Sequence, residues 1–156
     1  MNDYDQIRNL LAKYSHCADD DDFEGFQALF TPDGVLVEAG FPIPAARLPA
    51  LMKKYKAVSD AQPQPFGGKH LQMNSVIEVD GDRASAVTDL LSVHLRGDKG
   101  WSIGGNGRYT DELARVAGRW LIRRRTVTWY RGTISTFVTS TTLVFPSIAE
   151  RTPVGR

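Results

Sequence analysis

Apolar residues recur at helical spacing three times in the first 60 residues, which predicts three amphipathic helices. The stripe of the first helix, expected over residues 4–19, is Ile7, Leu10, Leu11, Tyr14 and Ala18. The stripe of the second is Phe23, Phe26, Leu29 and Phe30. The stripe of the third is Leu48, Leu51, Met52 and Tyr55. A turn signal at residues 31–34 precedes a short predicted strand at residues 35–38.

After residue 69 the hydrophobic period changes from 3.6 to 2, which is typical of strands. We expect strands over residues 70–79, 83–95, 101–115 and 120–130, with the glycine-rich residues 104–107 forming a bulge or bend. Helices followed by an antiparallel meander predict one α+β domain, in which the helices pack on one face of a curved sheet. Residues 132–156 are expected to add a strand or to cover a subunit contact.

The turn between the strands at 70–79 and 83–95 decides which residues share a face of the sheet. A three-residue loop, Val79 to Gly81, pairs His70 with Leu90 and places His94 about 13 Å further along the same face. A two-residue loop would send the two histidines to opposite faces, and we prefer the first register. The opposite, odd-numbered face is the more apolar one. The face that carries the two histidines is therefore either exposed to solvent or the lining of a cavity of mixed polarity.

Composition excludes several classes of protein. With 156 residues and a net charge of +1, the chain is one domain without a dedicated nucleic-acid surface. The single cysteine, Cys17, forms no intramolecular disulfide and is expected to be packing rather than a nucleophile. No targeting segment or membrane span is visible, so a cytoplasmic protein is expected.

Four consecutive carboxylates, residues 19–22, stand between the first two predicted helices. Asp21 or Asp22 is well placed to cap the second helix. Asp19 directly follows the apolar stripe, so it can turn inward, where a buried carboxylate needs a partner. His16 lies off the stripe and is expected at the surface.

Several segments resemble the SnoaL-like proteins of the nuclear transport factor 2-like superfamily. They are residues 14–34, residues 69–74, Gly81-Asp82-Arg83-Ala84, Gly107 to Asp111 and Gly118-Arg119-Trp120, within a resemblance that covers residues 4–130. The resemblance implies a cone-shaped α+β barrel with an internal pocket. It also implies a homodimer or homotrimer.

The site pattern is similar to that of scytalone dehydratase and hexachlorocyclohexane dehydrochlorinase, two enzymes of this superfamily. They pair an aspartate at the end of the first helix with a strand histidine, and Asp19 and His70 match these positions. His94 matches a second active-site histidine of scytalone dehydratase. Ala18 stands where that enzyme has a tyrosine, which puts dehydration of the same substrate in doubt. Further residues expected to contact substrate are Tyr14, Asn74, Asn106, Tyr109 and Trp129.

The resemblance implies a cofactor-free and metal-free acid–base enzyme of secondary metabolism. Such an enzyme is a lyase or dehydratase, or an isomerase or cyclase, and acts on a small apolar or polycyclic molecule. The alternative is a ligand-binding protein without catalysis, such as the small subunit of a ring-hydroxylating dioxygenase. Binding of anions by Arg123, Arg124 and Arg125 is a weaker possibility, because strand arginines are ordinarily solvated.

Overall fold

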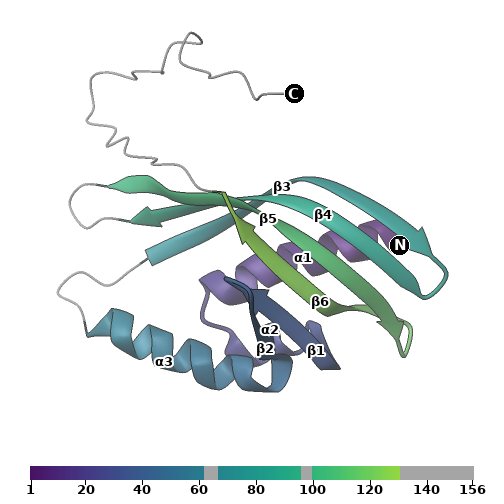
Figure 1. The fold of residues 1–156 in the computed structure, drawn as a ribbon, viewed down its shortest axis with the longest axis horizontal. Coiled ribbons are helices and arrows are strands. Elements are labelled where there is room, and N and C mark those ends of the chain that lie inside the picture. The colour runs from purple at the N-terminus through teal and green to yellow at the C-terminus, as the bar shows by residue number, and fades with distance from the viewer. Residues whose placement is uncertain (62–66, 96–99, 131–156) are drawn as a thin grey trace, which may run out of the picture.

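The computed structural model describes residues 1–61, 67–95 and 100–130 (Figure 1). The predicted role of residues 132–156 therefore lies outside the described residues. The helical elements are α1 (Asp3–Asp19), α2 (Phe23–Gln27), the 3₁₀ helix η1 (Ala45–Arg47) and α3 (Leu48–Asp60). The strands are β1 (Phe30–Glu38), β2 (Phe41–Pro44), β3 (Gly67–Asp80), β4 (Arg83–Leu95), β5 (Trp101–Val116) and β6 (Arg119–Trp129).

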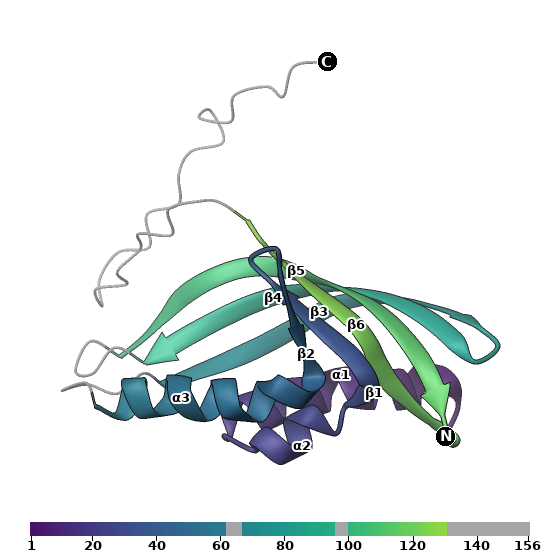
Figure 2. The ribbon, with the colours of Figure 1, turned by 60° about the horizontal axis from the view of Figure 1, so that its bottom comes forward.

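The six strands form one sheet in the order β2-β1-β6-β5-β4-β3. Only the β1–β6 pair is parallel, and the other neighbours are antiparallel. Figure 2 shows the curved sheet arching over α1, α2 and α3, so the helices cover its concave face. The predicted fold class, helices on a strongly curved and mainly antiparallel sheet, is confirmed.

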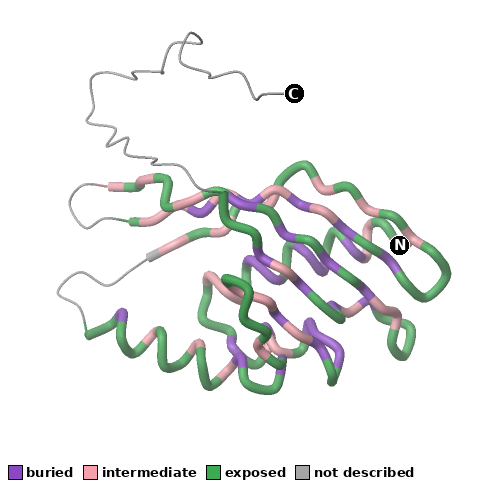
Figure 3. The backbone as a smooth tube through the Cα atoms, viewed as in Figure 1, coloured by how far each residue is buried: buried purple, intermediate pink, exposed green. Residues whose placement is uncertain are grey.

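The hydrophobic core lies between the concave face and the helices. Buried and exposed positions alternate along the central strands, as Figure 3 shows. On β4 the buried set is the even-numbered one: Ala84, Ala86, Thr88, Leu90 and Ser92. The more apolar odd-numbered set faces outward instead, and Leu71 and Met73 of β3 are 44% and 42% exposed. The inner face of the sheet is thus mixed in polarity, which suits a ligand cavity better than a dry core.

Two boundaries predicted near the second helix are wrong. Helix α2 ends at Gln27, and Phe30 already belongs to β1 rather than to the helix. The predicted turn at residues 31–34 lies within β1, whose pairing with β6 shifts register between Phe30 and Val35. Phe30 keeps its inward direction and is 4% exposed, so the apolar pattern was correct although the element was not.

The predicted hairpin register is also wrong. Asp80 pairs with Arg83, so the loop is the two residues Gly81 and Asp82, and Gly81 adopts a φ of +58°. A bulge between Met73 and Val76 then shifts the pairing by one residue, so His70 lies opposite Ser92. Because the bulge restores the parity that the shorter loop removed, the prediction that His70 and His94 share a face still holds.

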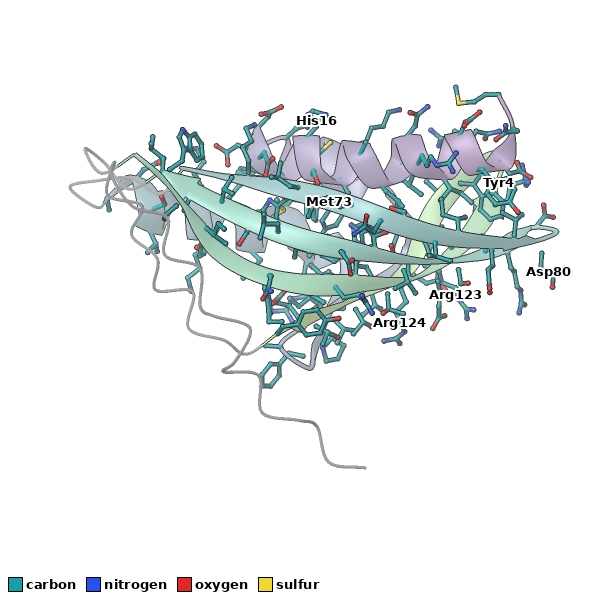
Figure 4. All side chains as sticks on the ribbon, turned by 90° about the horizontal axis from the view of Figure 1, so that it is seen from above. Tyr4, His16, Met73, Asp80, Arg123 and Arg124 are labelled. Atoms are coloured by element: carbon teal, nitrogen blue, oxygen red, sulfur yellow. The ribbon has the colours of Figure 1, made fainter. Side chains whose placement is uncertain are left out.

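Among the described residues β3 is one of the two edge strands of the sheet, and α1 lies alongside it (Figure 4). The amide of Gln72 on β3 donates to the α1 carbonyl of Leu11 at 2.6 Å and to Ser15 Oγ at 2.8 Å. These bonds fix the C-terminal half of α1 against β3. No helix of the described residues is long and apolar enough to cross a membrane.

Candidate functional site

A cavity of about 640 Å³ lies between the concave face of the sheet and the helices. Its apolar wall comes from α2, β1, β2 and α3 and includes Phe23, Phe26, Leu36, Ile43, Leu48 and Met52. Among its polar residues are Asp19 from the end of α1, Glu38 from β1, His70 from β3 and His94 from β4. An apolar pocket with a few convergent polar groups is the usual form of a small-molecule site.

Asp19 and His70 make direct contact in the wall of this cavity. The Asp19 Oδ1 atom lies 2.6 Å from His70 Nδ1, and the Asp19 side chain is only 5% exposed. This distance is typical of a hydrogen bond in which one partner carries charge. From the sequence, Asp19 requires a partner if its carboxylate is buried, and His70 is that partner.

The main chain of His70 holds the same carboxylate. The His70 N–H group donates to both carboxylate oxygens of Asp19, at 3.2 and 3.1 Å. This N–H is free to do so because β3 is an edge strand, on which alternate backbone groups have no neighbouring strand. Asp19 is thus fixed by both the backbone and the ring of His70, which leaves it little freedom to rotate.

The contact between Asp19 and Nδ1 determines which ring nitrogen can react. When Nδ1 carries the proton and donates it to Asp19, Nε2 is left with a free lone pair. Within the described residues Nε2 has no hydrogen-bond partner, and the His70 side chain is 34% exposed. The ring can therefore accept a proton from a molecule in the cavity.

His94 lies on the same face of the sheet as His70 but closer than predicted. It pairs with Gly68, two residues before His70, whereas the predicted register separates the histidines by four residues. Two residues of a strand correspond to about 7 Å. His94 and His70 can therefore contact the same small molecule rather than its opposite ends.

Tyr14 and Tyr109 lie in the core and are absent from the cavity lining. Their rings are 5.5 Å apart and stack around the guanidinium of Arg125, at 4.0 and 4.2 Å from its Cζ. Burial raises the pKa of Tyr14 to about 12, and burial also raises that of Tyr109. Both phenols are packing groups in this arrangement, and neither reaches the cavity to polarise a substrate carbonyl.

Asn74 and Asn106 lie on exposed positions away from the cavity. Asn74 occupies the β3 bulge with a φ of +54°, and its side chain donates to Asp89 at 3.2 Å. Asn106 is exposed, and on the side of the β5 bulge where it lies the even-numbered positions face away from the helices. The physical reason for both placements is strand parity, which the bulges of β3 and β5 decide.

Trp129 lies beside the cavity without being part of its lining. Its indole N–H donates to Glu38 Oε1 at 2.6 Å, and Glu38 does line the cavity.

The glycine-rich segment of β5 contains the predicted bulge. The pairing of β4 with β5 shifts by one residue between Ser92 and Val93.

The sequence did not predict a fully buried ion pair between Asp111 and Arg125. Two hydrogen bonds of 2.7 Å join them, and both side chains are 0% exposed. Burial by itself lowers the pKa of Arg125, but the Asp111 carboxylate more than offsets this and raises that pKa. The expectation that all three arginines 123–125 are solvated is wrong for Arg125, because its side chain points from β6 into the core, whereas Arg123 and Arg124 of the same strand are exposed.

The remaining acids of the junction have structural partners. Asp22 caps α2 by accepting a hydrogen bond from the Gly25 N–H at 2.9 Å, as one of the two predicted caps. Asp20 and Asp21 form ion pairs with Lys69 and Lys56. Burial, with the Asp22 carboxylate as the next cause, raises the pKa of the Cys17 thiol, which disfavours a reactive thiolate.

No cluster of three or more histidine, cysteine, aspartate or glutamate side chains within the described ranges is arranged to hold a metal ion.

Residues 1–126 match the family model of the SnoaL-like domain. The chain belongs to the SnoaL-like family. A comparison with curated proteins finds no match.

Solved structures of several relatives share the fold. A protein of unknown function from Mycobacterium tuberculosis is 28% identical, with a TM-score of 0.72 over 82% of this chain and 76% of that one. A Catenulispora acidiphila protein in complex with S-DNPA is 26% identical, with a TM-score of 0.67 over 81% and 92%. The beta subunit of a putative aromatic-ring-hydroxylating dioxygenase from Novosphingobium aromaticivorans is 25% identical, with a TM-score of 0.65 over 84% and 91%.

Proposed function

We propose that this SnoaL-like protein is a cofactor-free acid–base enzyme with His70 as its general base. The observation that carries the proposal is the 2.6 Å contact between Asp19 Oδ1 and His70 Nδ1 in the wall of the cavity. A neutral imidazole held in this way has the geometry and chemistry of a general base near neutral pH.

In the proposed reaction, Nε2 of His70 removes a proton from a carbon next to a carbonyl group. The electron pair of the broken C–H bond moves toward the carbonyl to form an enolate, and Asp19 stabilises the imidazolium that results. His94 contacts the carbonyl or leaving-group oxygen. The same first step begins an elimination, an isomerisation or an aldol-type cyclisation, which are the lyase and isomerase activities proposed.

The substrate class follows from the cavity. Its wall is mostly apolar, and its volume of about 640 Å³ exceeds the space that a bicyclic or tricyclic molecule needs. A bound small molecule in the similar Catenulispora acidiphila protein supports this use of the fold. We propose a small apolar or polycyclic carbonyl compound as substrate.

The test uses a panel of bicyclic ketones in D₂O, with 1-tetralone as its simplest member. Ligand-observed NMR measures binding, and mass spectrometry measures deuterium uptake next to the carbonyl. Binding with uptake above the uncatalysed rate supports the enzyme. Binding without uptake throughout the panel contradicts it and favours the second candidate function.

The second candidate is a ligand-binding subunit without catalysis, which the similarity to the dioxygenase beta subunit favours. For either function we propose a homodimer or homotrimer. Its contact surface is the outer face of β3–β5, where Leu71, Met73, Leu95, Trp101 and Ile103 are exposed. The mass of the purified protein in solution distinguishes these assemblies from a complex that needs another chain.

Asp19→Asn is expected to reduce deuterium uptake by about 100-fold or more while leaving the fold intact. The asparagine oxygen can still accept the backbone N–H of His70, but its NH₂ group cannot accept the proton of Nδ1. Asp20→Asn, next along the chain and paired with Lys69 at the surface, is the control. Equal activity of the two variants would make Asp19 a structural group only.

A further inference from the structure

The imidazole of His94 occupies space that exists only because residue 104 is glycine. A Cβ atom built on Gly104 would overlap Cδ2 and Nε2 of His94 and would lie 3.0 Å from its Cγ. The overlap involves the ring itself rather than the end of a flexible chain. Any side chain at this position would therefore have to displace the imidazole.

A second glycine lies on the other side of the ring. Gly68 of β3 pairs with His94, and a Cβ atom there would lie 3.6 Å from Nδ1 and 3.8 Å from Cε1. These are ordinary van der Waals distances, so this position tolerates a methyl group. The ring thus extends across the sheet from the β3 side to the β5 side, and its contact with β5 is the restrictive one.

The backbone does not require glycine at residue 104. Gly104 is the extra residue of a bulge, because Ser92 pairs with Gly105 and Val93 with Ile103. It is not among the residues of the described chain with a positive φ. The missing side chain, rather than the conformational freedom of glycine, is therefore what this position uses.

We propose that Gly104 is a positioning residue: because it has no side chain, the His94 ring can lie flat against the sheet. In this position the ring leaves the volume of the cavity open for a substrate, and His94 remains near the substrate of His70. An alanine would push the imidazole into the cavity, toward the α3 wall. The inference rests on the proposed function in one respect, namely that His94 faces the substrate.

A thermodynamic cycle tests the packing part of the inference. Gly104→Ala is expected to lower the folded-to-unfolded ratio about tenfold, which is typical of overpacking. In the His94→Ala background the same change is expected to cost almost nothing, because the ring is no longer there. Gly68→Ala is the matched control and should be close to neutral. An equal cost of Gly104→Ala in both backgrounds would overturn the inference, because the bulge rather than His94 would then need the glycine.

A second set of measurements tests how Gly104→Ala changes the ligand site. Gly104→Ala is expected to move the ring signals of His94 in NMR spectra and to weaken binding of 1-tetralone, while Gly68→Ala, whose methyl group reaches the ring and the cavity wall only at van der Waals distance, should have a much smaller effect on both. It should also lower kcat/KM for deuterium uptake about 100-fold, as misplaced site groups do. If the wild-type protein shows no uptake, the proposed function fails, and the cycle and the ring signals still decide the role of Gly104. If uptake and binding in Gly104→Ala match the wild type, the positioning role fails and the proposed function stands.

Discussion

Replacing His70 with glutamine is expected to abolish deuterium uptake into the ketone, with a loss of about 100- to 10,000-fold. Glutamine is similar in size and can still donate a side-chain N–H to Asp19, whose contact with the backbone N–H of residue 70 is unaffected. It has no group that accepts a proton near neutral pH. The loss is therefore specific to the base and is measured at saturating ketone.

Two controls separate the chemistry from damage to the fold. The midpoint of urea unfolding and the affinity for 1-tetralone should stay close to those of the wild type. His16→Gln changes an exposed histidine of α1 that is absent from the cavity lining, and it should keep full activity. Undiminished uptake by His70→Gln would remove His70 from the mechanism.

Asp111→Ala is expected to destabilise the protein by about 3–5 kcal/mol, the largest stability effect predicted here. The substitution leaves the guanidinium of Arg125 fully buried without its carboxylate. The two tyrosine rings beside it offer only a partial replacement for an ionic partner. Urea unfolding of the wild type and the variant measures the difference.

Glu112→Ala on the same strand is the matched control for this prediction. Glu112 pairs with Arg124 at 3.9 Å, and both side chains are about half exposed. Such surface pairs contribute little, so a change within about 0.5 kcal/mol is expected. Replacing both buried partners, with Asp111→Leu and Arg125→Met, should recover much of the loss. A cost of Asp111→Ala no larger than that of Glu112→Ala would show that the buried pair does not stabilise the fold.

The hydrophobic periods predicted most of the fold because they report burial directly. The change from helical to alternating spacing near residue 69 separates the helices from the four long strands. The prediction failed where a single residue changes the register. The short strand β2 was missed because proline and glycine interrupt the apolar pattern between residues 40 and 45.

The candidate site was predictable where a group had an obligatory partner. Asp19 follows the apolar stripe of α1, so its inward direction and its need for a partner followed from the sequence. The contacts of Asn74 and Asn106 were not predictable, because bulges decide to which side of the sheet they point. The pair of Asp111 and Arg125 has one signal, namely that Asp111 takes one of the alternating buried positions of β5, between Tyr109 and Leu113. Arg125 carries no such signal, because a register shift between Ile122 and Arg124 breaks the alternation along β6. Without the pairing of β5 with β6, that signal does not connect them.

The same limit applies to the glycine-rich segment of β5. Its sequence indicated a bulge, and the structure adds that the missing side chain of Gly104 makes room for an imidazole from the neighbouring strand. The spacing between residues 94 and 104 does not reveal this contact, because it depends on the loop between β4 and β5 and on the bulge together.

The measurement that tests the central claim most directly is the ¹⁵N NMR spectrum of the neutral His70 ring in the wild-type protein. It needs no substrate, because the chemical shifts of the two ring nitrogens show which one carries the proton. The proposed base requires the proton on Nδ1, in the hydrogen bond to Asp19, and a bare Nε2. A proton found on Nε2, with Nδ1 bare, would contradict the account, because His70 could not then accept a proton from a molecule in the cavity.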